Sequence, residues 1–313
     1  MKNYIGVIGT GIMGSGMATI LIGYHFKTII CSRNTAECKR GNNSVVSNFK
    51  YLKKTNLVTD EQTKEALEHL QVTYNYSDLS KCNIIIEAVT EDVNTKREVY
   101  KKLEEVCHPE TVFISVTSAL SADILAEGLK NKQRLIVGHT WNPPYLIPLV
   151  EIVKSRFTNK KTEIETIRLF NELEMEEVIL SKSIDGFIGN RIQHAMFREA
   201  LYLLDKGICS PEDIDKVILN TIGPRYANIG LMEYYDFVGL DLQYKIESFL
   251  FKSLCNAKKP QKYLTDRYRE GNLGAKTGQG IYDWTKKDYN NFMERKNRAF
   301  NHIRCNWGYR IKK

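Results

Sequence analysis

The stretch Tyr4-Ile-Gly-Val-Ile-Gly-Thr-Gly-Ile-Met-Gly14 runs from a short apolar strand into three spaced glycines. A helix is expected from Ser15 to Tyr24, and the next strand at Thr28–Cys31, which is the order of a dinucleotide-binding βαβ unit. The free amides at the start of such a helix, together with its dipole, attract an anion. The glycines permit a tight turn, a close approach of the backbone to a pyrophosphate, and close helix packing. The stretch therefore predicts a dinucleotide site, whose candidate residues are Gly9, Gly11, Ile12, Met13 and Gly14.

Strands and helices go on alternating to about residue 182. Further strands are expected at 71–74, 83–89, 112–116, 134–140, 149–153 and 176–182, and helical spacing over 35–70 is broken near 53–56. The strand at 83–89 is almost entirely apolar, as expected for a parallel strand covered on both faces. The fold class is therefore α/β, with a doubly wound, mostly parallel Rossmann sheet. We place this dinucleotide-binding domain at residues 1–184.

Only helical patterns follow the last expected strand. A helix is expected at 190–206, and Ser210-Pro-Glu-Asp213 has the capping serine, first-turn proline and acids of another helix start. Residues 230–255 repeat apolar side chains on one helical face, at 246, 249, 250 and 254. We place an all-helical domain at 185–284 and a basic helical extension at 285–313. The apolar residues of that extension, Phe292, Phe300 and Ile303, require cover.

Composition bounds the class of protein. At 313 residues, with 42% hydrophobic and 26% charged residues, the chain has the make-up of a soluble globular protein of one large or two ordinary domains. Six glycines interrupt the apolar stretch at 4–23, so we expect neither a signal sequence nor a membrane span. The seven cysteines are scattered, which predicts free thiols, no metal site and a cytoplasmic protein. The net charge of +8 accompanies no nucleic-acid-binding module, so we expect a small anionic substrate instead.

Two places beyond the glycines bear on the cofactor. An acidic residue after the second strand would favour NAD, but this chain has Ser32 and Arg33 there. The hydroxyl of Ser32 and the guanidinium of Arg33 can hold a phosphate, so they favour NADP, which carries an extra one. The alternative is that Arg33 is a solvated loop residue and NAD is used. Glu91 and Lys96 follow the strand at 83–89, at the edge of the sheet where ligands bind, and are candidates for cofactor contact. The alternative for them is a helix-start acid and a surface lysine.

A histidine and a glutamate on neighbouring strands form the candidate catalytic pair. Glu151 lies in an apolar run, and burying a carboxylate without a partner costs about several kcal/mol, so a partner must satisfy it. His139, at the mouth of the preceding strand, is its natural partner. A histidine exchanges protons near neutral pH, and a carboxylate on its far nitrogen fixes the tautomer. Such a pair is either catalytic or purely structural.

The motifs, taken in order, resemble the 3-hydroxyacyl-CoA dehydrogenase family over residues 3–284. They are Gly9-x-Gly-x-x-Gly14, Ile86-Glu-Ala-Val-Thr-Glu91, Ser115-Val-Thr-Ser118, His139-Thr-Trp-Asn-Pro143, Leu149-Val-Glu-Ile152, Asp185-Gly-Phe-Ile-Gly-Asn-Arg191 and Lys276-Thr-Gly-Gln-Gly-Ile-Tyr282. The resemblance implies that His139 is the general acid or base, that Glu151 orients it, and that Ser118 and Asn190 bind the reacting oxygen. It also implies cofactor contacts from Glu91 and Lys96, substrate binding and dimerisation by the helical domain, and a homodimer.

Departures from the family pattern bear on the substrate. Acyl-CoA members usually have two phenylalanines where this chain has Thr140-Trp141, and a lysine where it has Pro148. Acyl-CoA members usually have an asparagine after the first serine of the Ser115–Ser118 motif, where this chain has Val116. They also have a lysine-glycine-lysine sequence near the site of the CoA tail, where this chain has Lys54-Thr55-Asn56. The segment Asn142-Pro-Pro-Tyr-Leu-Ile-Pro148 is more similar to the branch that contains L-gulonate 3-dehydrogenase, lambda-crystallin and carnitine dehydrogenase, which act on free hydroxy acids.

Three functions follow from these residues. The leading one is an NAD(P)-dependent oxidoreductase that acts at the 3-hydroxyl or 3-keto carbon of a small hydroxy acid or related alcohol. The second is a short-chain 3-hydroxyacyl-CoA dehydrogenase on the same fold. The third is a non-catalytic, crystallin-like binding or structural protein; the intact residues at 118, 139, 151 and 190 weigh against it.

Overall fold

The computed structural model describes residues 4–306, and the side chains of residues 4–301. Within that range the chain forms two compact units. Of the described residues, the first comprises 4–188 together with 294–306, and the second comprises 189–293. Each unit is considered by itself below.

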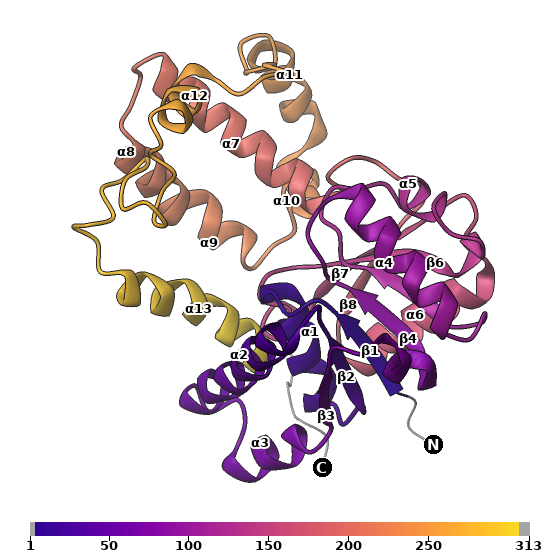
Figure 1. The fold of residues 1–313 in the computed structure, drawn as a ribbon. Coiled ribbons are helices and arrows are strands. Elements are labelled where there is room, and N and C mark those ends of the chain that lie inside the picture. Colours follow the sequence, from indigo (N-terminus) through magenta and orange to yellow (C-terminus); the bar gives the residue numbers. More distant parts are fainter. Residues whose placement is uncertain (1–3, 307–313) are drawn as a thin grey trace. The chain divides into compact units, whose positions relative to one another are not determined.

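The first unit contains one eight-stranded sheet (Figure 1). Its strands are β1 (Tyr4–Ile8), β2 (Thr28–Cys31), β3 (Leu70–Thr73), β4 (Cys82–Glu87), β5 (Val112–Ser115), β6 (Leu135–Thr140), β7 (Leu149–Lys154) and β8 (Glu176–Leu180). They lie in the order β3-β2-β1-β4-β5-β6-β7-β8, and every neighbouring pair is parallel except β6 and β7. The predicted doubly wound, mostly parallel sheet is confirmed.

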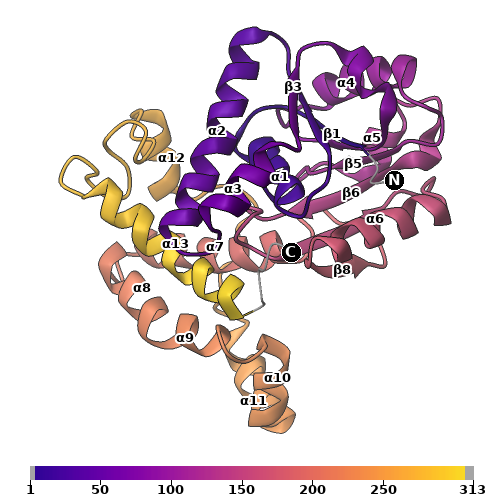
Figure 2. The same cartoon turned by 90° about the horizontal axis from the view of Figure 1, so that it is seen from below.

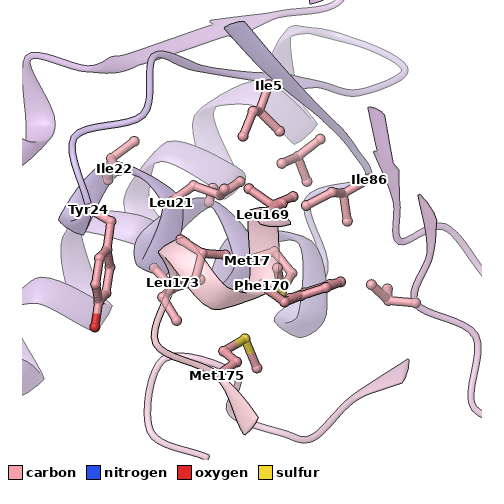
Figure 3. Close-up of a cluster of buried hydrophobic side chains, with 14 of the residues drawn as sticks. Ile5, Met17, Leu21, Ile22, Tyr24, Ile86, Leu169, Phe170, Leu173 and Met175 are labelled. Carbon is pink, nitrogen blue, oxygen red and sulfur yellow. The ribbon is translucent and has the colours of Figure 1, made fainter. Parts of the chain in front are cut away.

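Helices cover both faces of this sheet. They are α1 (Ile12–Gly23), α2 (Thr35–Lys54), α3 (Asp60–Leu67), α4 (Val93–Val106), α5 (Ala122–Ala126) and α6 (Lys160–Glu172), with short 3₁₀ turns at Tyr76–Lys81 and Lys132–Arg134. On one face, Met17 and Leu21 of α1 pack with Phe170 of α6 and with strand residues such as Ile86 (Figure 3). On the other, Tyr100 of α4 packs with Phe113 of β5. Two buried layers therefore hold the strand ends in fixed positions.

The helix after the glycines begins earlier than predicted. Gly11 is the N-cap of α1, so Ile12, Met13 and Gly14 form its first turn rather than a loop before Ser15. The first four amides of a helix lack partners within it. The glycine segment itself therefore supplies the free amides that we expected near an anion.

The second unit is helical, as predicted. Its helices are α7 (Gly189–Asp205), α8 (Pro211–Val217), a π-helical turn (Ile218–Ile222), α9 (Gly223–Tyr226), α10 (Leu231–Val238), α11 (Leu240–Leu250) and α12 (Lys262–Arg269). The helix start expected at Ser210 is present, and Ser210 forms a capping box with Asp213. The single helical run expected over 230–255 is instead broken at Gly239, whose φ of +106° ends α10. The apolar face expected around Phe249 is exposed.

The basic extension forms α13 (Tyr289–Asn306), and from Glu294 onward it belongs to the first unit. Phe300 packs against the core cluster, the Tyr51 hydroxyl donates to Asn301 Oδ1 at 3.0 Å, and Lys54 pairs with Glu294 at 2.9 Å. This part of α13 therefore runs beside α2 (Figure 2). Ile303, which was expected to need cover, lies outside the described side chains. Every helix within 4–306 is too short or too polar to cross a bilayer.

Candidate functional site

A cavity of about 640 Å³ opens where β1, β2 and β4 end. The strands β1 and β4 are neighbours here, and the connection from β1 leads to β2 on one side while the connection from β4 leads to β5 on the other. In doubly wound folds this switch point is where ligands bind. The cavity is lined by the ends of β1 and β2, the turns after β1, β2 and β4, the helices α1, α2 and α4, the 3₁₀ turn at Tyr76–Lys81, and two later loops. The lining residues are Ile8, Gly9, Thr10, Gly11, Ile12, Met13, Cys31, Ser32, Arg33, Glu37, Arg40, Tyr76, Ala88, Val89, Thr90, Thr95, Val99, Ser118 and Asn142.

The three glycines meet three different spatial demands. Gly9 has a φ of +105°, and a Cβ there would lie 2.5 Å from the carbonyl oxygen of Ala88. A Cβ on Gly14 would lie 2.1 Å from the carbonyl oxygen of Gly9. A Cβ on Gly11, in contrast, would meet no protein atom within 4 Å, although Gly11 lines the cavity. The space beside the Gly11 backbone is therefore open to a bound group, and the pyrophosphate of a dinucleotide fits there.

Three charged side chains, one just after β2 and two on the first turns of α2, lie at the cavity wall. Arg33 pairs with Glu37, and Arg40 lies 3.5 Å from the same carboxylate. The hydrogen bond from Arg33 holds the pKa of Glu37 below its usual value, against a smaller opposing effect of burial. Ser32 is buried, with its Oγ 3.1 Å from Cys38 Sγ. Two guanidinium groups against one carboxylate leave this corner with a positive charge in excess.

Glu91 and Lys96 meet beside the end of β4. Lys96 Nζ lies 3.3 Å from Glu91 Oε2, and the lysine is buried at 1% exposed, although neither residue is among those that line the cavity. Glu91 accepts hydrogen bonds from the Thr117 hydroxyl and from the amides of Ser118, at 2.9 Å, and Ala119, at 3.1 Å. Partial burial acts to raise the pKa of Glu91, but the Thr117 hydrogen bond and the charge of Lys96 outweigh it and lower the pKa.

His139 and Glu151 form the pair predicted from the sequence. They are directly opposite each other in the antiparallel register of β6 and β7, so their side chains leave the same face. Nδ1 of His139 lies 2.8 Å from Glu151 Oε2, and both residues are buried, at 3% and 1% exposed. The other carboxylate oxygen accepts the Ile188 amide at 2.8 Å. A carboxylate accepts hydrogen bonds, so the Nδ1 proton is fixed and Nε2 is left for proton exchange.

Apolar rings hold the imidazole in place. The ring centroid of His139 lies 5.2 Å from that of Phe187 and 5.6 Å from that of Trp141. Ser118 follows β5, the strand beside β6, so it lies at the same edge of the sheet as His139, and it lines the cavity. Asn190 belongs to the first turn of α7 in the second unit.

Sequence reasoning passed over three residues here. Glu37 and Arg40, on the first turns of α2, line the cavity beside Arg33; their position just after β2 was the available signal. Glu87 is completely buried at the end of β4, with four hydrogen-bonding partners. The signal for Glu87 was the one used for Glu151, a carboxylate inside an apolar strand. Clusters of side chains able to hold a metal are absent from the described part of the chain.

The arrangement can do two things chemically. The glycine turn and the charged corner at β2 can hold a dinucleotide along the strand ends. The His139–Glu151 pair can give or take a proton at the same edge of the sheet. A hydride acceptor combined with a proton acceptor is what the oxidation of an alcohol requires.

Comparison with known proteins agrees with this geometry. Residues 4–184 match the model of the 3-hydroxyacyl-CoA dehydrogenase NAD binding domain, and residues 186–284 match that of the 3-hydroxyacyl-CoA dehydrogenase C-terminal domain. The chain is 31% identical over 290 residues to a 3-hydroxybutyryl-CoA dehydrogenase of Clostridioides difficile, covering 90% of this chain and 99% of the relative. It is 28% identical to an L-carnitine dehydrogenase of Oceanobacillus iheyensis, covering 78% of this chain and 80% of that one.

Solved structures are also similar over most of the chain. The crystal structure of 5-formyl-3-hydroxy-2-methylpyridine 4-carboxylic acid 5-dehydrogenase, described as an NAD⁺-dependent dismutase, matches with a TM-score of 0.89 at 25% identity, covering 98% of this chain and 99% of that one. The (S)-3-hydroxybutyryl-CoA dehydrogenase of Ralstonia eutropha matches with a TM-score of 0.76 at 27% identity, covering 91% and 100%. The chain belongs to the 3-hydroxyacyl-CoA dehydrogenase family and is a nicotinamide-dependent dehydrogenase.

Proposed function

We propose that the protein interconverts the 3-hydroxyl and 3-keto forms of a small free hydroxy acid or related alcohol, with NADP as cofactor. The observation that carries the proposal is the buried contact between His139 Nδ1 and Glu151 Oε2 at 2.8 Å. When bound, the nicotinamide supplies or accepts the hydride. The residues of the chain then have to bind the substrate, orient it and move its proton.

In this proposal His139 exchanges the proton of the substrate hydroxyl through Nε2. Glu151 holds the ring through Nδ1 and stabilises its charged form, and the Ile188 amide holds Glu151. Ser118 and Asn190 donate hydrogen bonds to the reacting oxygen, which polarise it and set its orientation. General acid–base catalysis of this kind contributes about 10²–10⁴ in rate.

Two features support a free acid over a CoA thioester. The resemblance puts the CoA tail near residues 54–56, and in this structure Lys54 is paired with Glu294 of α13. The phenylalanine-rich segment of acyl-CoA members is replaced by Thr140-Trp141, and the Trp141 ring lies against His139. A short-chain 3-hydroxyacyl-CoA dehydrogenase remains the second candidate, supported by the 3-hydroxybutyryl-CoA dehydrogenases among the relatives.

A substrate panel tests the proposal. The purified protein is given free 3-hydroxy acids and the matching CoA thioesters, with NADP and NAD separately, and absorbance at 340 nm reports turnover. We expect kcat/KM for the best free acid to exceed that for its own thioester. Higher kcat/KM for the thioester would select the second candidate, and no turnover with either class would defeat both.

The charged corner at β2 predicts the choice of cofactor. We expect Arg33→Ala to raise the Kd of NADPH by at least about tenfold and that of NADH by much less, since a charge-assisted contact to the ribose phosphate is lost. Binding is measured by titrating cofactor fluorescence. Arg168→Ala is the control, because Arg168 makes comparable exposed pairs with glutamates on α6. An equal rise for both cofactors would contradict a phosphate site at Arg33.

The assembly and location are also proposed. The second unit exposes large apolar side chains, among them Val217, Leu219 and Met232, which supports a homodimer formed through this unit. Sedimentation equilibrium distinguishes a dimer from a monomer.

The division into residues 1–184, 185–284 and 285–313 is our proposal for the functional domains. Six free thiols among the described cysteines support a cytoplasmic protein, which fractionation would test.

A further inference from the structure

A fully buried carboxylate lies behind the cofactor cavity. Glu87 ends β4 and is 0% exposed. Its Oε1 accepts hydrogen bonds from the Val89 amide at 2.8 Å and from Lys96 Nζ at 2.7 Å. Its Oε2 accepts from the Tyr100 hydroxyl at 2.8 Å and from Ser115 Oγ at 2.7 Å. Four donors from β5, α4 and the loop between β4 and α4 therefore converge on one carboxylate.

A chain of contacts leads from Glu87 to the cavity. Lys96, itself 1% exposed, bridges Glu87 to Glu91, whose side chain is 39% exposed. Glu91 in turn binds the Thr117 hydroxyl and the amides of Ser118 and Ala119. Val89, Thr90 and Ser118 all line the cavity. The two loops that follow β4 and β5 are thus joined through one buried lysine.

The charges explain why this carboxylate matters to the loops. A buried ammonium group needs a partner of opposite charge, because burying an unpaired charge costs about several kcal/mol of desolvation free energy. Glu87 is the fixed, buried partner of Lys96, and Glu91 is the partly exposed one. Without the charge of Glu87, Lys96 would draw on Glu91 alone, and Glu91 would be pulled from its contacts with the loop after β5.

We infer that Glu87 is a positioning residue for the cofactor. It does not line the cavity; it acts by anchoring Lys96 and the Val89 amide, which place Glu91 and the loop at 117–119. This inference rests on the proposed dehydrogenase function and on the cofactor contacts that the family resemblance implies for Glu91 and Lys96. It adds a residue to that site rather than a new site.

The test compares two glutamates that each pair with a buried cation. Glu87→Gln keeps the shape and removes the charge. Glu104→Gln is the matched control, because Glu104 also lies on the first unit, pairs with a buried arginine, Arg134, at 3.0 Å, and lines no part of the cavity. NADPH and NADH are titrated separately by fluorescence, and Tm is measured for each variant. For the cofactor that the wild type binds more tightly, we expect Glu87→Gln to raise Kd at least about tenfold. Glu104→Gln should lower Tm and leave Kd unchanged.

A double-mutant cycle tests the route of action. If Glu87 acts through Glu91, Glu87→Gln should raise Kd by less in a Glu91→Gln background than in the wild type. Should Glu87→Gln fail to fold, Tyr100→Phe removes one donor to Glu87 with little change in volume and is expected to raise Kd in the same direction.

Three results would overturn the inference. The first is an unchanged cofactor Kd in Glu87→Gln or, if that variant does not fold, in Tyr100→Phe. The second is an equal rise in cofactor Kd in Glu104→Gln, and the third is that the effects of Glu87→Gln and Glu91→Gln on binding are fully additive. The readout is cofactor binding without substrate. If the wild type binds cofactor but turns over no member of the substrate panel, the proposed function is wrong, and the binding test of Glu87 can still be carried out.

Discussion

His139→Gln is expected to lower kcat by at least about a hundredfold, or about 2.7 kcal/mol of transition-state stabilisation, while the Kd of the cofactor stays nearly unchanged. Glutamine keeps polar groups near Glu151 but cannot carry the substrate proton. Turnover at 340 nm and a fluorescence titration of the cofactor separate the two effects.

A second buried histidine supplies the control. His25 is 7% exposed, lies 3.6 Å from a carboxylate oxygen of Glu65, and is not among the residues that line the cavity. His25→Gln should therefore change Tm and leave kcat as it is. Equal turnover in wild type and His139→Gln would remove His139 from the mechanism.

Two alanine substitutions in the glycine turn are expected to fail in different ways. A methyl group on Gly14 would lie 2.1 Å from the Gly9 carbonyl oxygen, so Gly14→Ala forces the backbone apart and should lower Tm by roughly 10 °C. A methyl group on Gly11 meets no protein atom within 4 Å, so Gly11→Ala should keep the Tm of the wild type. The methyl group occupies the cavity instead and should raise the cofactor Kd by about tenfold or more.

Differential scanning calorimetry and cofactor titration distinguish the two outcomes. Gly207→Ala is a useful reference, because Gly207 has a φ of +65° with open space around it and lies in the second unit. It should cost stability through backbone strain alone and leave cofactor binding intact. Wild-type affinity in Gly11→Ala would contradict the location of the pyrophosphate at this turn.

The parts of the fold that depend on local pattern were predictable from the sequence. The ranges expected for β1 and β2 are those observed, because short apolar runs bounded by glycine or charge specify buried strands. The His139–Glu151 contact was also predictable, since a carboxylate in an apolar strand needs a nearby partner.

What depends on how distant elements meet was not predictable. The hydrogen bonds from Lys96, Tyr100 and Ser115 to Glu87 require β4, β5 and α4 to converge, and the periodicity of one segment does not show which other segments it meets. The break at Gly239 is similar, because a single glycine within an apolar helical pattern is compatible with continuation or with termination. Nor does the sequence show that the face around Phe249 is exposed, since amphipathic spacing only says which residues share a side.

The central claim is that the imidazole held by Glu151 moves the substrate proton. Chemical rescue tests it most directly: single-turnover hydride transfer is followed at 340 nm in His139→Ala, with and without added imidazole. The account predicts that hydride transfer in His139→Ala is at least about a hundredfold slower than in the wild type. Added imidazole should accelerate it in a saturable manner, and the acceleration should be smaller in the double variant His139→Ala/Glu151→Ala. Transfer in His139→Ala at the wild-type rate without imidazole would contradict it.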